Sequence, residues 1–235
     1  MNWPSVVEIE INRRCNRRCS YCPNSLEHWA KAEERMSDAL FQRVIGMLAE
    51  IAFSGRLSFH FFNEPLLHPR LEELVAFARA ALPLTHMVLY TNGDLLDDRR
   101  HQALLTAGID LFLVTRHGWD DFPDRPFQFV QHPDNFALSG RGGTIAGLER
   151  PLELACFGPS EMMIVTLNGD VVLCHEDANR QYVMGSLASQ DLATVWHSQA
   201  FVTARHALED GKRGDGPEIC RHCDNKLYPI PGAAI

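Results

Sequence analysis

Apolar residues at positions 5–116 alternate between the two-residue period of a strand and the 3.6-residue period of a helix. The strand pattern occurs at residues 6–12, 57–60, 86–91 and 110–115, and the helical pattern at residues 37–51, 70–82 and 97–107. Ser37 can cap the first of these helices, and Pro69 can open the second. Repeated β-α units favour a parallel sheet, so we predict an α/β fold, an abridged and open parallel β/α barrel (a partial TIM barrel) that ends near Thr144.

The pattern changes after residue 117, where prolines become frequent and the apolar runs become short. Residues 162–167 and 171–174 flank Asn168-Gly169, a strong signal for a β-hairpin. A short helix at residues 192–201 and a Gly-rich loop follow the hairpin. We therefore predict two domains, the partial barrel at 1–150 and a smaller domain with the hairpin at 151–235.

Charge and composition narrow the class of protein. Among the 235 residues, 22 are basic and 30 acidic, and this net charge of -8 argues against a nucleic acid or an anionic membrane as the main partner. No apolar run approaches the ~18 residues that span a bilayer, and the first residues lack the pattern of a signal peptide. We expect a cytoplasmic protein that acts on a small polar molecule or a protein. The arginine pairs at 13–14, 17–18 and 99–100 are expected to be solvated.

The seven cysteines fall into two groups. Cys15, Cys19 and Cys22 offer three thiolates in one short loop, which leaves one position of a four-coordinate site open. The second group can close a four-thiolate site and consists of Cys156, Cys174, Cys220 and Cys223. In a reducing compartment these spacings indicate metal ligands before disulfides. A Cys-x-x-Cys pair taken alone would equally suit a zinc site in an interaction protein.

The cysteine loop after an apolar strand, with Tyr21 just before the last cysteine, resembles the radical S-adenosylmethionine (AdoMet) superfamily. That resemblance implies a 4Fe-4S cluster on the three cysteines, AdoMet on its fourth iron, and an external one-electron donor of flavodoxin or ferredoxin type. The C-terminal cysteines resemble the twitch module, a short form of the SPASM domain. This second resemblance implies another 4Fe-4S cluster, an auxiliary one, on Cys156, Cys174, Cys220 and Cys223.

Ligands of parallel sheets gather where the strands end, and five polar or aromatic side chains are expected to contact the cofactor there. Tyr21 suits contact with adenine. In the superfamily, the corner that matches Asn63 and Glu64 binds the methionyl amino group, mostly through backbone atoms. Asn92 and Arg116 end the next two strands and are cofactor-binding candidates on the same ground.

Several segments resemble the family of the 2-deoxy-scyllo-inosamine dehydrogenase of butirosin biosynthesis, among them 138–143 and 174–177. The family oxidises an aminocyclitol alcohol to a ketone. The resemblance implies that Arg141 interacts with the reacting hydroxyl and that Glu176 binds the cyclitol; Glu176 is also a candidate proton acceptor. The chain departs from the family at Asn63 and at His175, so the substrate can differ.

We therefore predict a radical AdoMet dehydrogenase for a secondary alcohol of a small polyol or aminocyclitol. Two alternatives stay open at this point. A redox-neutral dehydratase or epimerase would use the same first radical step, and a peptide-modifying enzyme would use the same pair of clusters. Peptide-modifying relatives usually carry a recognition domain, for which this chain has no spare length.

Overall fold

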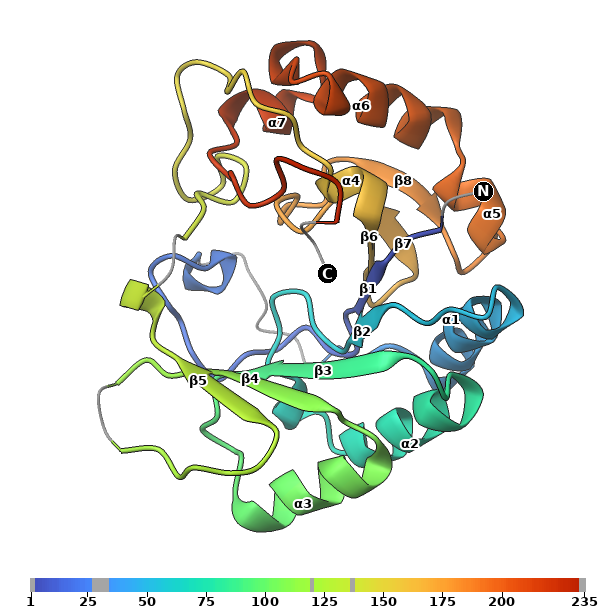
Figure 1. Ribbon diagram of the computed structural model, residues 1–235, viewed down its shortest axis with the longest axis vertical. Coiled ribbons are helices and arrows are strands. Elements are labelled where there is room, and N and C mark those ends of the chain that lie inside the picture. Colours follow the sequence, from blue (N-terminus) through green and yellow to red (C-terminus); the bar gives the residue numbers. More distant parts are fainter. Residues whose placement is uncertain (1–2, 27–33, 119–120, 136–137, 233–235) are drawn as a thin grey trace.

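One eight-stranded sheet forms the centre of the computed structural model, which describes residues 3–26, 34–118, 121–135 and 138–232 (Figure 1). The strand order is β5-β4-β3-β2-β1-β6-β7-β8. The strands are β1 (Val6–Ile9), β2 (Arg56–Ser58), β3 (His86–Thr91), β4 (Leu111–Thr115), β5 (Gln128–Gln131), β6 (Met162–Val165), β7 (Asp170–Val172) and β8 (Val183–Ser186). Neighbours from β5 to β6 are parallel, and the last two pairs are antiparallel. Among the described residues β5 and β8 are the two edges, which confirms the predicted open, abridged barrel.

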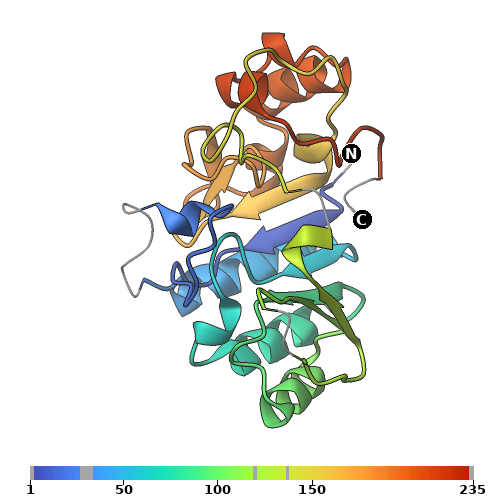
Figure 2. The same cartoon turned by 90° about the vertical axis from the view of Figure 1, so that its left-hand side faces the viewer.

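Three helices follow the first three strands and lie on the outer side of the sheet (Figures 1 and 2). They are α1 (Asp38–Glu50), α2 (Leu71–Ala81) and α3 (Asp98–Ala107). Ser37 caps α1 by accepting a hydrogen bond from the backbone N–H of Leu40, and Asp97 caps α3 in the same way. These bounds agree closely with the helices predicted from the apolar spacing.

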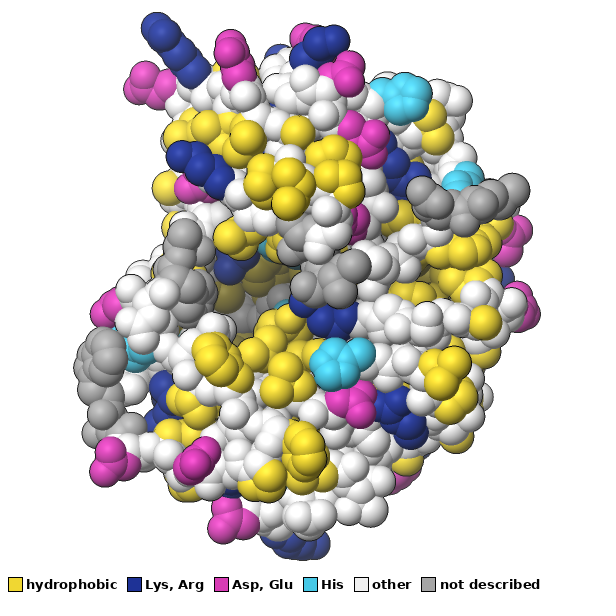
Figure 3. Space-filling view, viewed as in Figure 1, with side chains coloured by type: hydrophobic (Ala, Val, Ile, Leu, Met, Phe, Trp, Pro, Cys, Tyr) yellow, Lys and Arg dark blue, Asp and Glu magenta, His cyan; other side chains and the backbone are white. Residues whose placement is uncertain are grey.

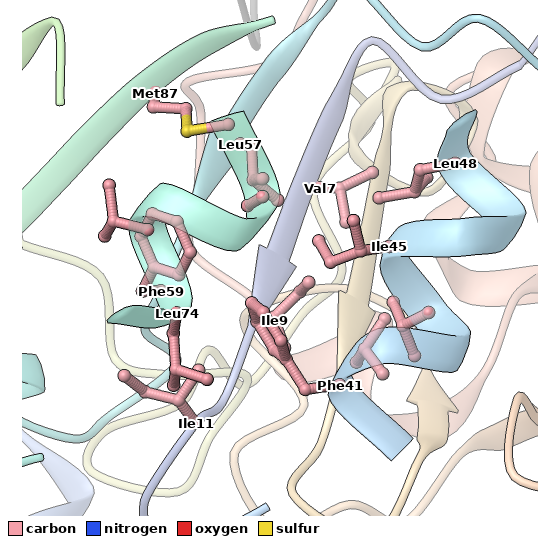
Figure 4. Close-up of a cluster of buried hydrophobic side chains, with 14 of the residues drawn as sticks. Val7, Ile9, Ile11, Phe41, Ile45, Leu48, Leu57, Phe59, Leu74 and Met87 are labelled. Atoms are coloured by element: carbon pink, nitrogen blue, oxygen red, sulfur yellow. The ribbon is translucent and has the colours of Figure 1, made fainter. Parts of the chain in front are cut away.

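Alternating side chains of β1 enter two different environments. Val7 and Ile9 point toward the apolar face of α1, and Ile11, just beyond the strand, lies beside Leu74 of α2 (Figure 4). Val6 and Glu8 point to the opposite, inner side of the curved sheet, where Val6 packs with residues of β6 and β7. The outer face of the sheet therefore holds the main core, and its inner face is left for a cavity.

The second half of the chain continues the same sheet. β6 pairs in parallel with β1, with Val6 opposite Met162, so strands run on across the predicted domain boundary, which stays a prediction. The predicted hairpin is confirmed as β6 and β7, and Gly169 takes the left-handed φ of 88° that its turn requires.

The helices of this half are α4 (Gly158–Glu161), α5 (Leu192–Trp196), α6 (Gln199–Glu209) and α7 (Glu218–His222). Short 3-10 helices are η1 (Pro23–Ser25), η2 (Pro65–Leu67), η3 (Pro133–Asn135) and η4 (Arg213–Asp215).

One sequence-based expectation needs correction, and one edge strand was missed. The helix predicted at residues 192–201 is two helices, because Ser198 accepts a hydrogen bond from the N–H of Phe201 and starts α6 anew. The edge strand β5 was not predicted, because its side chains are exposed or half-exposed and carry no strand periodicity. Within the described residues, none of the helices has the length and apolar character required to cross a bilayer.

Candidate active site

The largest group of predicted site residues lines one cavity of about 340 Å³ at the inner face of the sheet. All three N-terminal cysteines line it, as do Arg141 from the loop after β5 and His175 from the segment after β7. In the space-filling view this face is hollowed between the region of α6 and α7 and the region of β3 to β5 (Figure 3). The cavity therefore brings together segments far apart in the sequence.

The cysteine loop directly follows β1 and holds its three thiols as a set. The N–H of Cys22 donates to the carbonyl of Cys19 at 2.9 Å, and the N–H of Arg17 donates to Sγ of Cys15 at 3.4 Å. Burial raises the pKa of Cys15 to about 11 and also raises the pKa of Cys19 and Cys22. None of the seven cysteines, all of which are described, forms a disulfide. The loop thus offers three free ligands around an open cavity, as a 4Fe-4S cluster with one open iron requires.

Asp94, which follows β3, fastens the cysteine loop to the sheet. Its carboxylate accepts two hydrogen bonds of 2.6 Å from the guanidinium of Arg17 and one of 2.9 Å from Asn16. Arg17 is therefore only partly solvated, because its guanidinium is paired with Asp94. Arg116 also contacts Asp94, at 3.4 Å, and lies over the ring of Phe122. Arg116 lines a neighbouring cavity with Asp94 and not the one that holds the cysteines, so its predicted contact with the cofactor stays a prediction.

Glu64 ties the ends of β2 and β3 together beneath the cavity. Its carboxylate accepts hydrogen bonds from the hydroxyl of Thr91 at 2.8 Å, from the N–H of Asn92 at 2.8 Å and from the N–H of Leu66 at 3.0 Å. Burial raises the pKa of Glu64, which is 2% exposed. Asn63 donates its amide to Asn12 and accepts from the N–H of Phe61. Because these side chains are engaged within the protein, a ligand at this corner would meet backbone groups.

Tyr21 and Asn92 lie on the wall of the same cavity. The hydroxyl of Tyr21 is 2.8 Å from Nδ1 of His117, and the two rings are stacked 6.0 Å apart. Burial raises the pKa of Tyr21. The side chain of Asn92 donates to Asn16 in the cysteine loop at 2.8 Å. Both residues are thus in place beside the thiols, and their contact with a cofactor stays a prediction.

The four C-terminal cysteines line a second cavity between α4, α6, α7 and the segment after β7. Cys220 and Cys223 are buried, and burial raises the pKa of both to about 12. Arg213, only 1% exposed, donates to the carbonyls of Leu154 and Asn225 and so fixes the segments around the site. Among the described residues no group of three or more His, Cys, Asp or Glu side chains is arranged to hold a single metal ion. Four thiols around one cavity are the donor set that a fully ligated 4Fe-4S cluster requires.

Glu176 lines the second cavity and contacts Arg141 and His175, which line the first. Its carboxylate accepts from Ser139 at 2.7 and 2.8 Å and from Asn225 at 2.7 Å, and it lies 2.9 Å from Nε2 of His175. Burial by itself would raise the pKa of Glu176, but His175, the charge of Arg141 and the bond from Asn225 outweigh it and lower the pKa to about 2. The carboxylate is thus held as an anion, which disfavours it as a proton acceptor.

Arg141 reaches the cavity from a strained loop. Its φ is 53°, in the left-handed region that side chains rarely adopt, and Gly142 and Gly143 follow in the same region. Its Nη1 is 3.6 Å from Glu176, its guanidinium is 5.5 Å from the ring centre of Phe62, and its buried Nε has no hydrogen-bond partner among the described residues. Strain of this kind persists where surrounding structure enforces it, often at functional sites.

Two side chains are shared by both cavities. His175 and Tyr228 line the cavity with three thiols and also the cavity with four, and their rings meet edge to face at 5.6 Å. Together they form the wall between the two thiol sets. Sequence reasoning noted His175 as a departure from a family pattern, and it passed over Tyr228 and Glu8.

The comparisons with known proteins agree with the two thiol sets. The model of the radical SAM superfamily matches residues 9–136, and that of the SPASM iron-sulfur cluster-binding domain matches residues 156–224. The S-adenosyl-L-methionine-dependent 2-deoxy-scyllo-inosamine dehydrogenase of Niallia circulans is 35% identical over 234 residues, which cover 94% of this chain and 93% of that protein. A crystal structure of BtrN in complex with AdoMet and 2-DOIA matches with a TM-score of 0.90 at 32% identity, covering 97% of this chain and 96% of that one. A structure of BtrN in an open conformation gives a TM-score of 0.82 at 31% identity, covering 100% and 98%.

Proposed function

The chain belongs to the radical AdoMet superfamily, and we propose that it is a dehydrogenase that oxidises a secondary alcohol of a small aminocyclitol to a ketone. Membership in the superfamily and the SPASM match bring the expected cofactors, AdoMet and two 4Fe-4S clusters. The dehydrogenase from Niallia circulans, similar over 94% of this chain, supports the reaction type and the substrate class.

One observation carries this proposal: the cavity with three thiols and the cavity with four share His175 and Tyr228 as a common wall. When bound, AdoMet and its cluster supply a 5'-deoxyadenosyl radical that removes a hydrogen atom from a substrate carbon, and the second cluster accepts an electron. A substrate held against the shared wall could therefore lose a hydrogen atom on the side of the cavity with three thiols and an electron toward the cavity with four. With the hydroxyl proton released as well, the alcohol has lost two protons and two electrons, and a ketone results.

The chain's own residues would bind and orient the substrate. Arg141 cannot act as a base at neutral pH, because a guanidinium pKa exceeds ~12, but it can stabilise negative charge on the reacting oxygen. Glu176 holds Arg141 in place at 3.6 Å and is itself fixed by Ser139 and Asn225. The aromatic wall formed by Phe62 and Tyr228 would exclude water from the reacting carbon.

Further parts of the proposal concern the protein's surroundings. We infer that an external flavodoxin or ferredoxin supplies the single electron that starts each turnover. The requirement for seven reduced cysteines favours the cytoplasm as the location. Nucleic acids and membranes have no role in this account, in keeping with a net charge of -8.

The test is turnover by the anaerobically reconstituted protein with AdoMet, a chemical reductant and a panel of aminocyclitols. The proposal expects a ketone two mass units lighter than the alcohol, with one AdoMet consumed for each ketone. AdoMet cleavage that no cyclitol stimulates, together with no ketone, would refute it.

A further inference from the structure

The inner face of β1 carries a carboxylate for which the account above gives no role. Glu8 lies inside the strand, is 7% exposed and lines the cavity that holds the three thiols. Its carboxylate forms no hydrogen bond and no ion pair with any residue that the structure describes. Its oxygens face the cavity, so a donor that enters the cavity can bind them.

The other buried glutamates near the site are all partnered. Glu10, two residues further along the same face of the chain, accepts from Arg180 at 2.7 and 3.0 Å and from the N–H of Leu167 at 2.9 Å. Glu64 and Glu176 each accept hydrogen bonds from several donors. Glu8 differs from them because it faces open space in the cavity.

Arg56, from the adjacent strand β2, lines the same cavity as Glu8. It forms no ion pair with Glu8 in the described part of the chain, and its guanidinium is 5.9 Å from the ring centre of Tyr90. His60 stacks on Tyr90 at 4.4 Å, and burial lowers the pKa of His60, so that its ring is neutral at pH 7. The side chains of His60, Tyr90 and Tyr228 line the cavity with Glu8. This end of the cavity thus combines the unpaired carboxylate of Glu8 with aromatic rings, a combination that binds ammonium groups, and the guanidinium of Arg56 lies on the same wall.

We propose that Glu8 forms a subsite for the protonated amino group of the substrate. The proposal rests on the proposed function and assigns the two ends of the substrate, with the amine at Glu8 and the reacting hydroxyl at Arg141. AdoMet also has an amino group, but Glu8 lies within β1, whereas the cysteine loop and the corner at Glu64 follow the strand ends. Glu176 is a weaker candidate for the amine, because its carboxylate is already occupied by donors.

The test is calorimetric binding to the holoprotein with oxidised clusters and AdoMet, where no turnover occurs. The probes are 2-deoxy-scyllo-inosamine and the same ring with a hydroxyl in place of the amine. For Glu8→Gln, a variant of equal size, we expect affinity for the amine to fall by about 10- to 100-fold and affinity for the hydroxyl ring to change less than about threefold. Glu8→Asp should retain a preference for the amine. Glu10→Gln, just beyond the end of β1, is the matched control and should leave that preference unchanged.

The inference would be overturned if Glu8→Gln lost the same affinity for both ring compounds, or lost affinity for neither. A fall in AdoMet affinity in that variant would overturn it too, as would a wild-type protein that binds neither ring. Product analysis separates this inference from the proposed function. If ketone forms but Glu8→Gln binds the amine normally, the subsite is wrong and the function stands. If binding of the amine compound depends on Glu8 but no ketone forms, the subsite stands and the proposed function is wrong.

Discussion

Nη1 of Arg141 lies 3.6 Å from Oε1 of Glu176, although the two residues come from separate segments on either side of β6. The contact places a cation that faces the first cavity against an anion that lines the second. We propose a common function for the two residues, in which the guanidinium would meet the reacting oxygen and the carboxylate would hold the guanidinium in place. Their roles in catalysis are predictions that substitution can test.

Replacing Arg141 separates catalysis from folding. Arg141→Gly should abolish ketone formation while both clusters and slow AdoMet cleavage remain, because Arg141 is not a cluster ligand. Since φ at this position is 53°, Arg141→Gly should also unfold at a higher temperature than Arg141→Ala, by an amount equivalent to about 1 kcal/mol. Iron analysis, product analysis and thermal unfolding check the three outcomes. Loss of iron in either variant would assign Arg141 a structural role.

The two thiol sets should load independently. Reconstituted protein is expected to hold about eight irons and eight sulfides, because two 4Fe-4S clusters use all seven cysteines. The triple variant with alanine at positions 15, 19 and 22 should keep about four irons. A matching variant of Cys220 and Cys223 should keep the other four and still bind AdoMet. A triple variant with the full iron content would contradict the assignment of the ligands.

Asp94 should stabilise the cysteine loop. Asp94→Asn removes the charge that holds Arg17, a half-exposed pair worth roughly 0.2–1 kcal/mol. We expect chelators to remove iron from the first cluster about two- to fivefold faster, with the auxiliary cluster unchanged. Asp98→Asn is the control. It breaks the ion pair between Asp98, at the start of α3, and Arg125, and this pair lies away from the cysteine loop. Equal acceleration in both variants would show a general loss of stability.

His68 should make folding sensitive to mild acid. Burial, then the charges of Arg35 and Arg70, lowers the pKa of this 5% exposed side chain from 6.5 to about 4. The folded state thus binds fewer protons than the unfolded state between these values, so stability is full above pH 6.5 and falls as the pH drops toward 4. Between pH 7.5 and 5.5 the wild type should lose roughly 1 kcal/mol of unfolding free energy more than His68→Asn. Parallel pH profiles from urea unfolding would refute this pKa.

Local sequence signals predicted much of this fold. β3 was predicted with the bounds it has, because its residues are mostly buried and apolar and a turn sequence follows them. Asn168-Gly169 predicted the hairpin, because few sequences other than Asn-Gly suit such a turn. The edge strand β5 could not be predicted, since its pairing with β4 depends on backbone bonds and not on a buried face.

The site divides in the same manner. Close spacing along the chain predicted the cysteine triad, and resemblance predicted Arg141 and Glu176. The hydrogen bonds between Arg17 and Asp94 join residues 77 positions apart, and no local sequence pattern predicts such a contact. Glu8 left one signal, a charged residue within a buried apolar strand, but only the curvature of the sheet shows that it faces a cavity.

The central claim is that the substrate radical ends by losing an electron. All seven cysteines are assigned to two clusters, so no protein thiol remains to return a hydrogen atom, as an epimerase would require. The direct test is turnover in deuterium oxide with mass spectrometry of the product. The account predicts a ketone two hydrogens lighter than the alcohol, without deuterium at the oxidised carbon. A product of unchanged formula that carries one carbon-bound deuterium would contradict it.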